Sequence, residues 1–165
     1  MFRPHLPLLA ATALLLAGCG QSEPKIPGAA AKPMEKAIFM STTDCAESGK
    51  LPADQCGTLI DRAVKAHETK APTFKGVRSC EEASGPDRCE KMMDGTFRMR
   101  LQAFLFEING AKSTAAPLYP SAKGAIGFRD AAKKPVSARD DSLIVSQAAL
   151  TAAHENARLA KEMAK

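Results

Sequence analysis

The sequence has no tryptophan and few aromatic residues of any kind, which together make up 5% of the chain. It also lacks a Gly-x-Ser-x-Gly elbow, a glycine-rich loop ending in Lys-Ser or Lys-Thr, and a His-Glu-x-x-His helix. The low aromatic content predicts a thin core. The missing motifs leave no set of nucleophile, base and orienting group, so we expect a protein that is not an enzyme and that has no cofactor and no metal.

Two further absences argue against a thiol-disulfide enzyme and against a nucleic-acid-binding protein. No Cys-x-x-Cys pair is present, although a thiol-disulfide enzyme would need one. The formal net charge is +5, but acidic and basic residues are mixed, and no basic stripe is interleaved with aromatic residues. Single-stranded nucleic acids are bound by such stripes, so no nucleic-acid partner is expected.

Histidine is scarce. After residue 18 the chain contains only His67 and His154. His67 lies at the edge of an apolar helical stripe, where a structural histidine is more common than a base or a ligand. His154 is followed by Glu155, whose side chain points to a different face of the same predicted helix. Neither histidine is predicted to be catalytic.

The N-terminal stretch carries the most specific signal. An apolar run over residues 6–16 follows basic residues and is too short to span a bilayer as a mature helix. It ends in Leu16-Ala17-Gly18-Cys19, which resembles the bacterial lipobox. The resemblance implies that residues 1–18 are a signal peptide and that Cys19 becomes the N-terminus, carrying diacylglyceryl and a further acyl chain such as palmitate. Two or three chains make the attachment close to permanent.

The residues after the lipobox set the expected location and the domain boundary. Gly20 follows Cys19, whereas Asp at this position is the usual signal for retention in the inner membrane. We therefore expect an outer-membrane protein that is held by its lipid and faces the periplasm. Residues 19–36 contain three prolines and no apolar period, which predicts a flexible linker. Residues 37–165 are then enough for a single domain.

The domain is expected to belong to the α+β class. An apolar run at 37–40 predicts a short edge strand, followed by a turn or helix cap at 41–44. The strongest helix is predicted over 53–70 because its apolar residues recur at helical spacing and Pro72 ends it. The residues of this predicted stripe are Cys56, Leu59, Ile60, Ala63, Val64 and His67. A second short helix is indicated by Ser79 and Glu82, a capping box, and it ends at Gly85-Pro86.

Residues 97–108 fit two interpretations. Phe97, Leu101 and Phe104 recur at helical spacing, whereas residues 97–102 alternate like a strand until Phe104 breaks the alternation. A helix is favoured because the segment has almost no β-branched residues and ends at Asn109-Gly110, which suits a helix C-terminus. Prolines and glycines between 112 and 136 predict a small β-hairpin or meander. An alanine-rich helix from residue 142 or 146 to 163 completes the domain, with loose packing left open.

Four cysteines remain besides Cys19, and an even number in an exported chain indicates two disulfides. Three pairings are possible. Cys45 with Cys56 and Cys80 with Cys89 are favoured, because glycine and proline place a turn inside each loop. A tetrahedral zinc site is the rival interpretation, although the spacing departs from zinc knuckles.

The chain resembles the bacterial lipoproteins grouped under domain of unknown function 1190, the YgiB-like proteins. The resemblance rests on the lipobox and on the spaced cysteine frame, with fainter similarity at 117–119 and 127–128. The motifs that carry it are Asp44-Cys45, Cys56 at the start of a helix ending at Ala71-Pro72, and Cys80-Glu81 followed by Cys89. It implies an envelope lipoprotein without an established activity. One departure is residues 97–108, where family members carry a stretch rich in glycine, methionine and aromatic residues.

These observations favour a non-catalytic interaction or scaffold protein that binds an unknown envelope protein. The mature aromatic residues are concentrated in one part of the chain and could form its interaction surface. These residues are Phe97, Phe104, Phe106, Tyr119 and Phe128. The alternative for them is that they form the core. An alternative function is a small-ligand carrier with a closed pocket between helix and sheet, lined by Phe104, Phe106, Tyr119 and Phe128.

Overall fold

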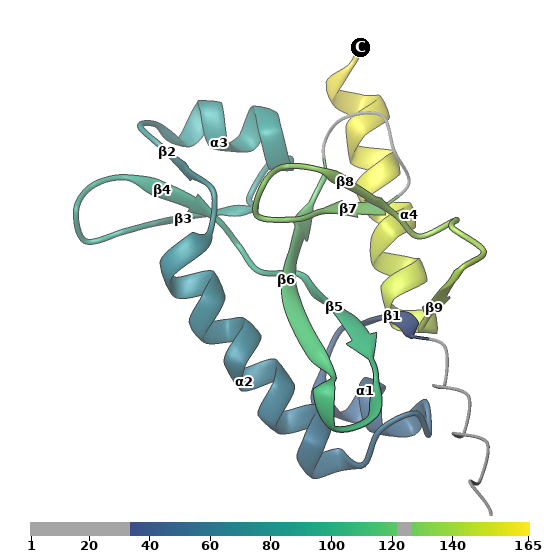
Figure 1. The fold of residues 1–165 in the computed structure, drawn as a ribbon. Helices are drawn as coiled ribbons and strands as arrows, with labels where there is room; N and C mark the ends of the chain where they lie inside the picture. The colour runs from purple at the N-terminus through teal and green to yellow at the C-terminus, as the bar shows by residue number, and fades with distance from the viewer. Residues whose placement is uncertain (1–33, 122–126) are drawn as a thin grey trace, which may run out of the picture. The chain divides into compact units, whose positions relative to one another are not determined.

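Two β-sheets and four α-helices make up the described part of the chain, residues 34–121 and 127–165 of a computed structural model (Figure 1). The larger sheet has the strand order β8-β7-β6-β5-β1-β9, and the smaller has the order β2-β4-β3. This arrangement confirms the α+β class. The predicted signal peptide and residues 19–33 of the predicted linker lie outside the described residues. The first strand begins at Glu35, two residues before the predicted start of the domain.

The larger sheet is built around β1 (Glu35–Phe39) and β5 (Ala103–Ile108), which pair antiparallel with Phe39 opposite Phe104. A short 3-10 turn connects β5 to β6, which runs antiparallel beside it. The other strands are β6 (Thr114–Pro120), β7 (Gly127–Arg129), β8 (Pro135–Ser137) and β9 (Leu143–Val145). Strands β6, β7 and β8 are joined antiparallel, which confirms the predicted meander. Strand β9 runs parallel to β1.

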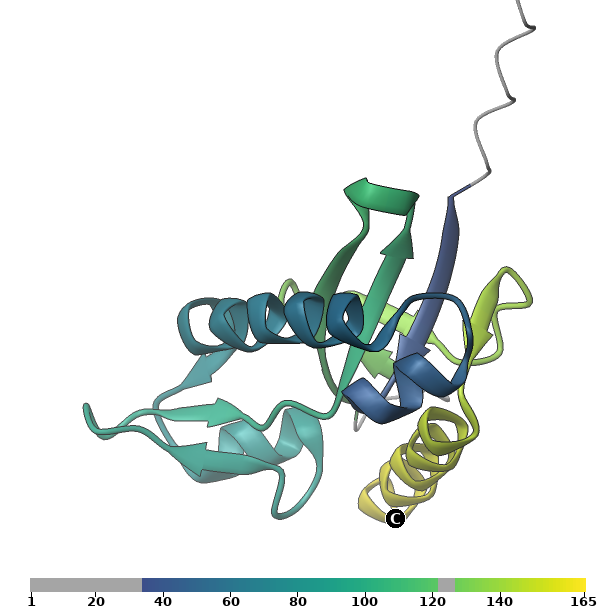
Figure 2. The same cartoon turned by 90° about the horizontal axis from the view of Figure 1, so that it is seen from below.

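Helices cover both faces of the larger sheet (Figure 2). Strand side chains alternate between faces, so Phe39 and Phe106 pack toward α2 (Ala53–Lys70), while Ile38 packs toward α4 (Gln147–Met163). The short helix α1 (Thr42–Glu47) lies beside α2 and contributes Cys45 to the same core. The sheet is therefore buried on both sides.

The predicted helix over 53–70 is confirmed with the same bounds. Its buried residues are Cys56, Leu59, Ile60, Ala63 and His67, and Val64 is half-buried. Ser41 caps α1, because its side-chain oxygen accepts a hydrogen bond from the Asp44 backbone N–H at 3.1 Å. Helix α4 begins after Ser146, whose hydroxyl accepts from the Ala149 backbone N–H at 3.1 Å.

Helix α4 packs on the domain through a shallow face. Ala149, Ala153 and Asn156 are its buried residues, whereas the last residues of the chain are exposed. The small alanine side chains let the helix approach the sheet closely. This helix is therefore packed over most of its length.

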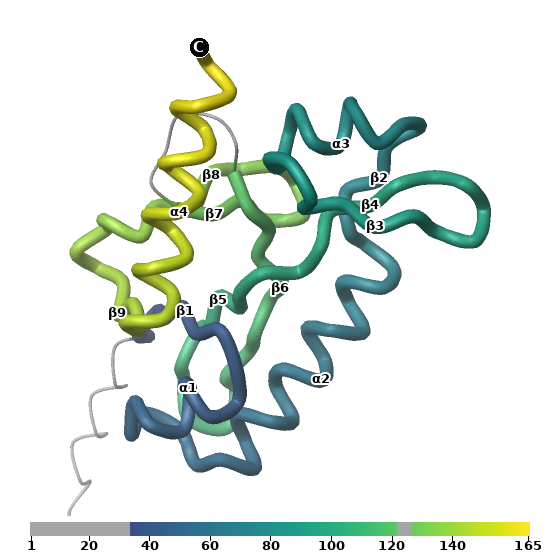
Figure 3. The backbone as a smooth tube through the Cα atoms, turned by 180° about the vertical axis from the view of Figure 1, so that it is seen from behind, coloured from purple at the N-terminus to yellow at the C-terminus, as the bar shows by residue number. Residues whose placement is uncertain are grey.

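The smaller sheet lies where α2 ends, together with α3 and away from α1 (Figure 3). Its elements are β2 (Thr73–Phe74), β3 (Cys89–Lys91) and β4 (Phe97–Met99), with α3 (Val77–Ser84) packed against them. Helix α3 confirms the second short helix, and Gly85 ends it with φ of 101°. The capping box is wrong, because Ser79 lies inside the helix and its hydroxyl donates to the Gly76 carbonyl at 2.9 Å.

The helix favoured over 97–108 is wrong, because this segment forms β4 and β5. The side chains from Phe97 to Met99 alternate between the two faces of β4. The chain then changes direction, and the side chains of β5 begin a separate alternation. Strand β5 is apolar on both faces because helices cover both sides of the sheet. Because residues 100–102 interrupt the alternation between β4 and β5, the apolar residues of the whole segment fall at helical spacing by coincidence.

Two other strand predictions need correction. The strand at 37–40 is not an edge strand, since β1 lies between β5 and β9. Strand β9 was not predicted, and its three residues lie between 142 and 146, the two predicted starts of the last helix. Its burial is intermediate throughout, and such a short strand forms only because β1 offers a free edge beside it.

Candidate functional site

The four domain cysteines form two disulfides with the predicted pairing. Cys45 bonds to Cys56 and joins α1 to α2, and Cys80 bonds to Cys89 and joins α3 to β3. The zinc alternative is therefore wrong for these sulfurs. In the described part of the chain, no group of three or more His, Cys, Asp and Glu side chains could hold a metal ion. Cys19, the predicted lipidation site, lies outside the described residues.

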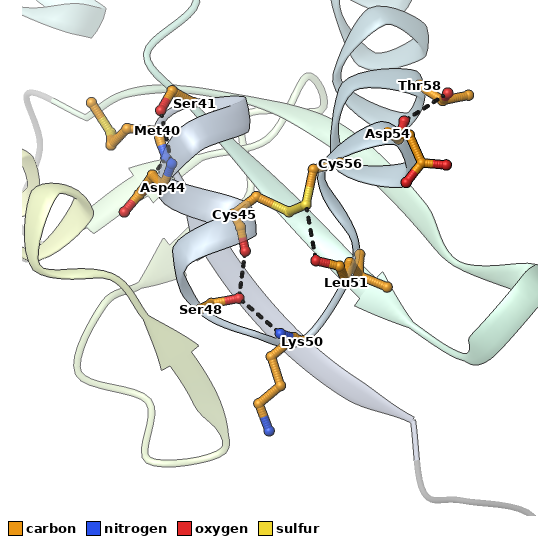
Figure 4. Close-up of a disulfide and its surroundings, with 10 residues drawn as sticks. All are labelled: Met40, Ser41, Asp44, Cys45, Ser48, Lys50, Leu51, Asp54, Cys56 and Thr58. Carbon is orange, nitrogen blue, oxygen red and sulfur yellow. Dashed lines mark hydrogen bonds between the residues drawn. A yellow bond between two sulfur atoms is a disulfide. The ribbon is translucent and has the colours of Figure 1, made fainter.

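Polar contacts surround the first disulfide (Figure 4). The Ser48 hydroxyl donates to the Cys45 carbonyl at 2.6 Å, which holds the end of α1. The Asp44 carboxylate accepts from the Met40 backbone N–H at 2.7 Å and from the Ser146 hydroxyl at 2.6 Å. Asp44 thus connects β1, α1 and the start of α4, which is a structural role.

The predicted aromatic interaction surface is not a surface in this structure. Phe106, Tyr119 and Phe128 are 0% exposed and Phe104 is 6% exposed, while Phe97 is half-buried. Phe106 makes an edge-to-face contact with Phe39, with ring centroids 5.1 Å apart. These aromatic residues are core residues, and the core alternative holds for all four buried ones.

The aromatic residues also do not meet in one place. Phe104 and Phe106 face α2, Phe128 faces α4, and Tyr119 packs with Cys80 and Met99 beside the smaller sheet. The small-ligand pocket expected from the sequence requires all four side chains to line one cavity. The larger sheet separates them because consecutive strand residues point to opposite faces. They therefore line no common pocket.

A polar cluster lies between the two sheets and consists of buried His67 and Tyr119 with half-buried Glu90 and Arg98. The Nδ1 of His67, which is 6% exposed, lies 3.3 Å from the Tyr119 hydroxyl, and its Nε2 lies 3.6 Å from Oε1 of Glu90. Arg98 Nε donates to the same Glu90 oxygen. We call these four residues the interlayer cluster. The cluster connects α2 and β6 of the main body to β3 and β4 of the smaller sheet.

Burial and charge set the protonation of the interlayer cluster. Burial, helped by the positive charge of Arg98, lowers the pKa of His67 below its usual value despite the opposing effect of Glu90. Burial raises the pKa of Tyr119 to about 12, so its hydroxyl stays protonated. Partial burial raises the pKa of Glu90, but Arg98 and His67 outweigh this and the net pKa is lowered. The geometry fits a neutral His67 that accepts from Tyr119 and carries its proton on Nε2.

A groove opens beside the interlayer cluster, at the hairpin that joins β3 to β4. It has a volume of about 450 Å³. Its lining residues are Glu90, Lys91, Met92, Met93, Asp94 and Arg98, and we call it the hairpin groove. Met93 is fully exposed at the tip. The hairpin turn was missed in the sequence, although Asp94-Gly95 between two short alternating runs is a hairpin signal.

A second cavity lies at the start of the domain. It has a volume of about 640 Å³ and is bounded by the loop before α2, the first residue of β1 and the β5–β6 connection. Its lining residues are Glu35, Gly49, Lys50, Leu51, Pro52, Gln55, Ile108, Asn109 and Gly110, and we call it the loop cavity. Lys50 and Glu35 form an ion pair at 3.1 Å beside it.

The family of the chain follows from a comparison with family descriptions. Residues 33–163 match the family described as "Protein of unknown function (DUF1190)". The chain belongs to this family. The match covers both disulfides, both sheets and all of α4, so the described fold is the family domain. Searches of curated proteins and of solved structures found no match. The family carries no established activity, which agrees with the expectation from the sequence.

One negative observation concerns the membrane. Among residues 34–121 and 127–165, no helix is both long enough and apolar enough to cross a bilayer.

Proposed function

We propose that this protein is a lipoprotein of the bacterial cell envelope, anchored through Cys19 in the outer membrane and facing the periplasm. In this proposal its domain acts as a non-catalytic interaction or scaffold module that binds another envelope protein. The observation that carries the interaction role is the hairpin groove with fully exposed Met93 at its tip.

The disulfides support the envelope location. Structural disulfides persist in exported proteins and are rare in the reducing cytosol of most organisms. Both pairs lie inside one short domain, where each closes a small loop between neighbouring elements. Together with the lipobox at residues 16–19 and the signal-peptide pattern before it, they favour export and lipid anchoring.

The chemistry of the hairpin groove supports a polypeptide partner. Its lining combines two thioether side chains with two cations and two carboxylates. Methionine side chains are flexible and polarizable, so they adapt to apolar groups of different shape. The mixed charges can pair with a polypeptide that carries both signs, whereas a nucleic acid would require an excess of cations.

The interlayer cluster supports a non-catalytic role. A general base must reach the proton that it removes, directly or through one water. Both ring nitrogens of His67 face protein side chains, and Tyr119 is fully buried. The other domain histidine, His154, is exposed on the surface of α4.

The proposed location is tested by fractionation of the full-length chain. We expect the wild-type protein to remain with the outer membrane until detergent is added, and the Cys19→Ser variant to appear as an unprocessed precursor or a soluble form. Gly20→Asp is the matched variant, because it should keep the lipid but move the protein to the inner membrane. Normal processing and retention of Cys19→Ser would contradict the proposal.

The proposed surface is tested by photo-crosslinking from position 93 in the envelope. A photoreactive residue there should give a protein adduct of defined mass, and Met92→Ser together with Lys91→Glu should remove it. A photoreactive residue at exposed Arg62 on α2 is the control position. Equal adducts from both positions, or none from position 93, would show that the hairpin groove is not the interaction surface.

The small-ligand carrier stays a second candidate because of the loop cavity. Its volume of about 640 Å³ lies in the range of pockets that hold small organic ligands. Native mass spectrometry of the detergent-solubilised protein tests this candidate. A bound small molecule that is lost in Gln55→Trp, which fills the cavity from α2, would favour the carrier. A protein of unliganded mass would count against it.

A further inference from the structure

A third, smaller cavity is lined by two arginine side chains that form no ion pair with any described residue. It has a volume of about 180 Å³ and lies where the α3–β3 loop, the β4–β5 connection and the end of β6 meet. Its lining residues are Asp87, Arg88, Arg100, Leu101, Gln102 and Pro120. It shares no lining residue with the hairpin groove or the loop cavity.

Arg88 is held in place by neutral groups. Its Nη1 donates to the side-chain oxygen of Asn156, which is 2% exposed on α4. The same Asn156 amide donates to Oε1 of Gln102 at 2.8 Å and to the Gly127 carbonyl at 2.9 Å. Gln102 in turn donates to Asn156 at 3.2 Å. This network fixes the position of the Arg88 guanidinium without neutralising its charge.

The positive charge of the cavity is only partly balanced. Within the described residues, no carboxylate lies within 4.0 Å of Arg88 or Arg100. Burial lowers the pKa of Arg88, and the more distant Glu155 opposes this effect. A half-buried cation is normally paired with an anion, because losing water contacts around a charge is costly. Asp87 also lines the cavity, so the two arginines exceed the acidic side chains of the lining by one charge.

The arginines have hydrogen-bond donors to spare. Each guanidinium carries five N–H groups in a planar fork. Arg100 Nε donates to the Cys89 carbonyl at 3.1 Å and Arg88 donates to Asn156, and these are the side-chain bonds of the two arginines in the described part of the chain. Paired guanidinium forks match the oxygens of phosphate, which can accept from both.

We infer that this cavity is an anion site that binds a phosphate group between Arg88 and Arg100. Two guanidinium forks offer more N–H donors than the two oxygens of a carboxylate can accept, which suits the larger number of oxygens on phosphate. The cavity of about 180 Å³ has room for one phosphate group. Gln102 supplies a neutral wall that is already ordered by Asn156. The phosphate is either free or part of a phosphomonoester headgroup. This site is separate from the proposed interaction surface and does not depend on it.

The test is a titration of the full chain in detergent with inorganic phosphate and, in a second arm, with glycerol 3-phosphate, at constant ionic strength. Saturable binding is expected by isothermal titration calorimetry. In NMR spectra of the same titration, the amide chemical-shift changes should be centred on Arg88 and Gln102. Binding of glycerol 3-phosphate at least as tight as that of phosphate indicates a headgroup, and preference for phosphate indicates the free ion. Both results support the site.

Variants separate the site from general charge attraction. Arg100→Gln should weaken phosphate binding by about tenfold or more, as expected when a charge-assisted contact is lost. Arg62→Gln makes the same charge change on the exposed face of α2 and should leave the affinity unchanged. Arg88→Lys keeps the charge but loses the fork, so it should also weaken binding. Arg88 contacts Asn156, so the Arg88→Lys result is interpreted only if the circular dichroism spectrum shows that the variant is folded. Arg100 is exposed, so Arg100→Gln tests the site without this risk to the fold. Equal losses in Arg62→Gln and Arg100→Gln, or no saturable binding, would overturn the inference.

Discussion

The two sheets of this protein are stabilised in different ways. The larger sheet is buried between α2 and α4, and its two apolar clusters contain most of the large buried side chains. Among the described residues, the smaller sheet has three buried core residues, Cys80, Met99 and Tyr119, with partly buried side chains such as Phe97 packed against them. Tyr119 belongs to the larger sheet. The smaller sheet has too little apolar surface of its own, so it depends on a disulfide and on polar contacts with the main body.

This difference indicates which part of the molecule is better suited to provide a binding surface. The hairpin groove and the cavity lined by Arg88 and Arg100 both include residues of the smaller-sheet region, where side chains are less buried than in β1 and β5. Regions of lower local stability commonly provide binding surfaces, because they can adapt to a partner. The larger sheet then acts as the support that holds this region at a defined place.

The largest expected effect lies in the larger sheet. Phe106→Ala should lower the free energy of unfolding by about 3–5 kcal/mol, because it removes a fully buried ring that contacts Phe39. Phe97→Ala in the smaller sheet should cost less than half as much, since Phe97 is only half-buried. Urea denaturation followed by circular dichroism measures both. Equal losses would mean that the two sheets have equally tight cores.

The disulfides should come next in size. Each closes a loop of similar length, with cysteines 11 and 9 residues apart, so the chain-entropy model gives each about 3 kcal/mol. We expect Cys45→Ser/Cys56→Ser to destabilise the whole domain, because this bond lies in the main core. Cys80→Ser/Cys89→Ser should first open the smaller sheet, which gives a broader unfolding transition in urea. A sharp two-state transition in both variants would contradict the comparison.

The smallest effect should be a pH dependence from the interlayer cluster. The pKa of His67 is lowered in the folded protein, so the unfolded chain binds the extra proton more readily. Its contribution to stability is therefore fully present above about pH 6.5, the ordinary value, and is lost as the pH falls toward the lowered pKa. His67→Gln should flatten the stability profile over this range, measured as the urea midpoint against pH. His154→Gln on the exposed face of α4 is the control.

Local patterns in the sequence predicted much of the fold. The helix over 53–70 has one apolar stripe and a proline stop, and both cysteine pairs enclose turn residues, so these features follow from short-range chemistry. Residues 97–108 do not, because the strand pattern of β5 depends on two helices that are distant in the sequence and cover both its faces. Strand β9 likewise needs the free edge of β1.

The candidate sites were harder to predict for the same reason. His67 and Tyr119 are 52 residues apart, and Arg88 and Asn156 are 68 apart, so no local pattern reports their contact. The aromatic residues could be seen in the sequence, but their alternation across a doubly covered sheet decides that they are buried. Only the hairpin tip, with Asp94-Gly95, carried a local signal.

Amide hydrogen exchange on the Cys80→Ser/Cys89→Ser variant tests most directly that the two sheets are stabilised differently. The account predicts that amides in β3 and β4 lose most of their protection relative to the wild type, while amides in β1 and β5 keep theirs. Loss of protection in both sheets together, or full protection in β3 and β4 without the disulfide, would contradict it.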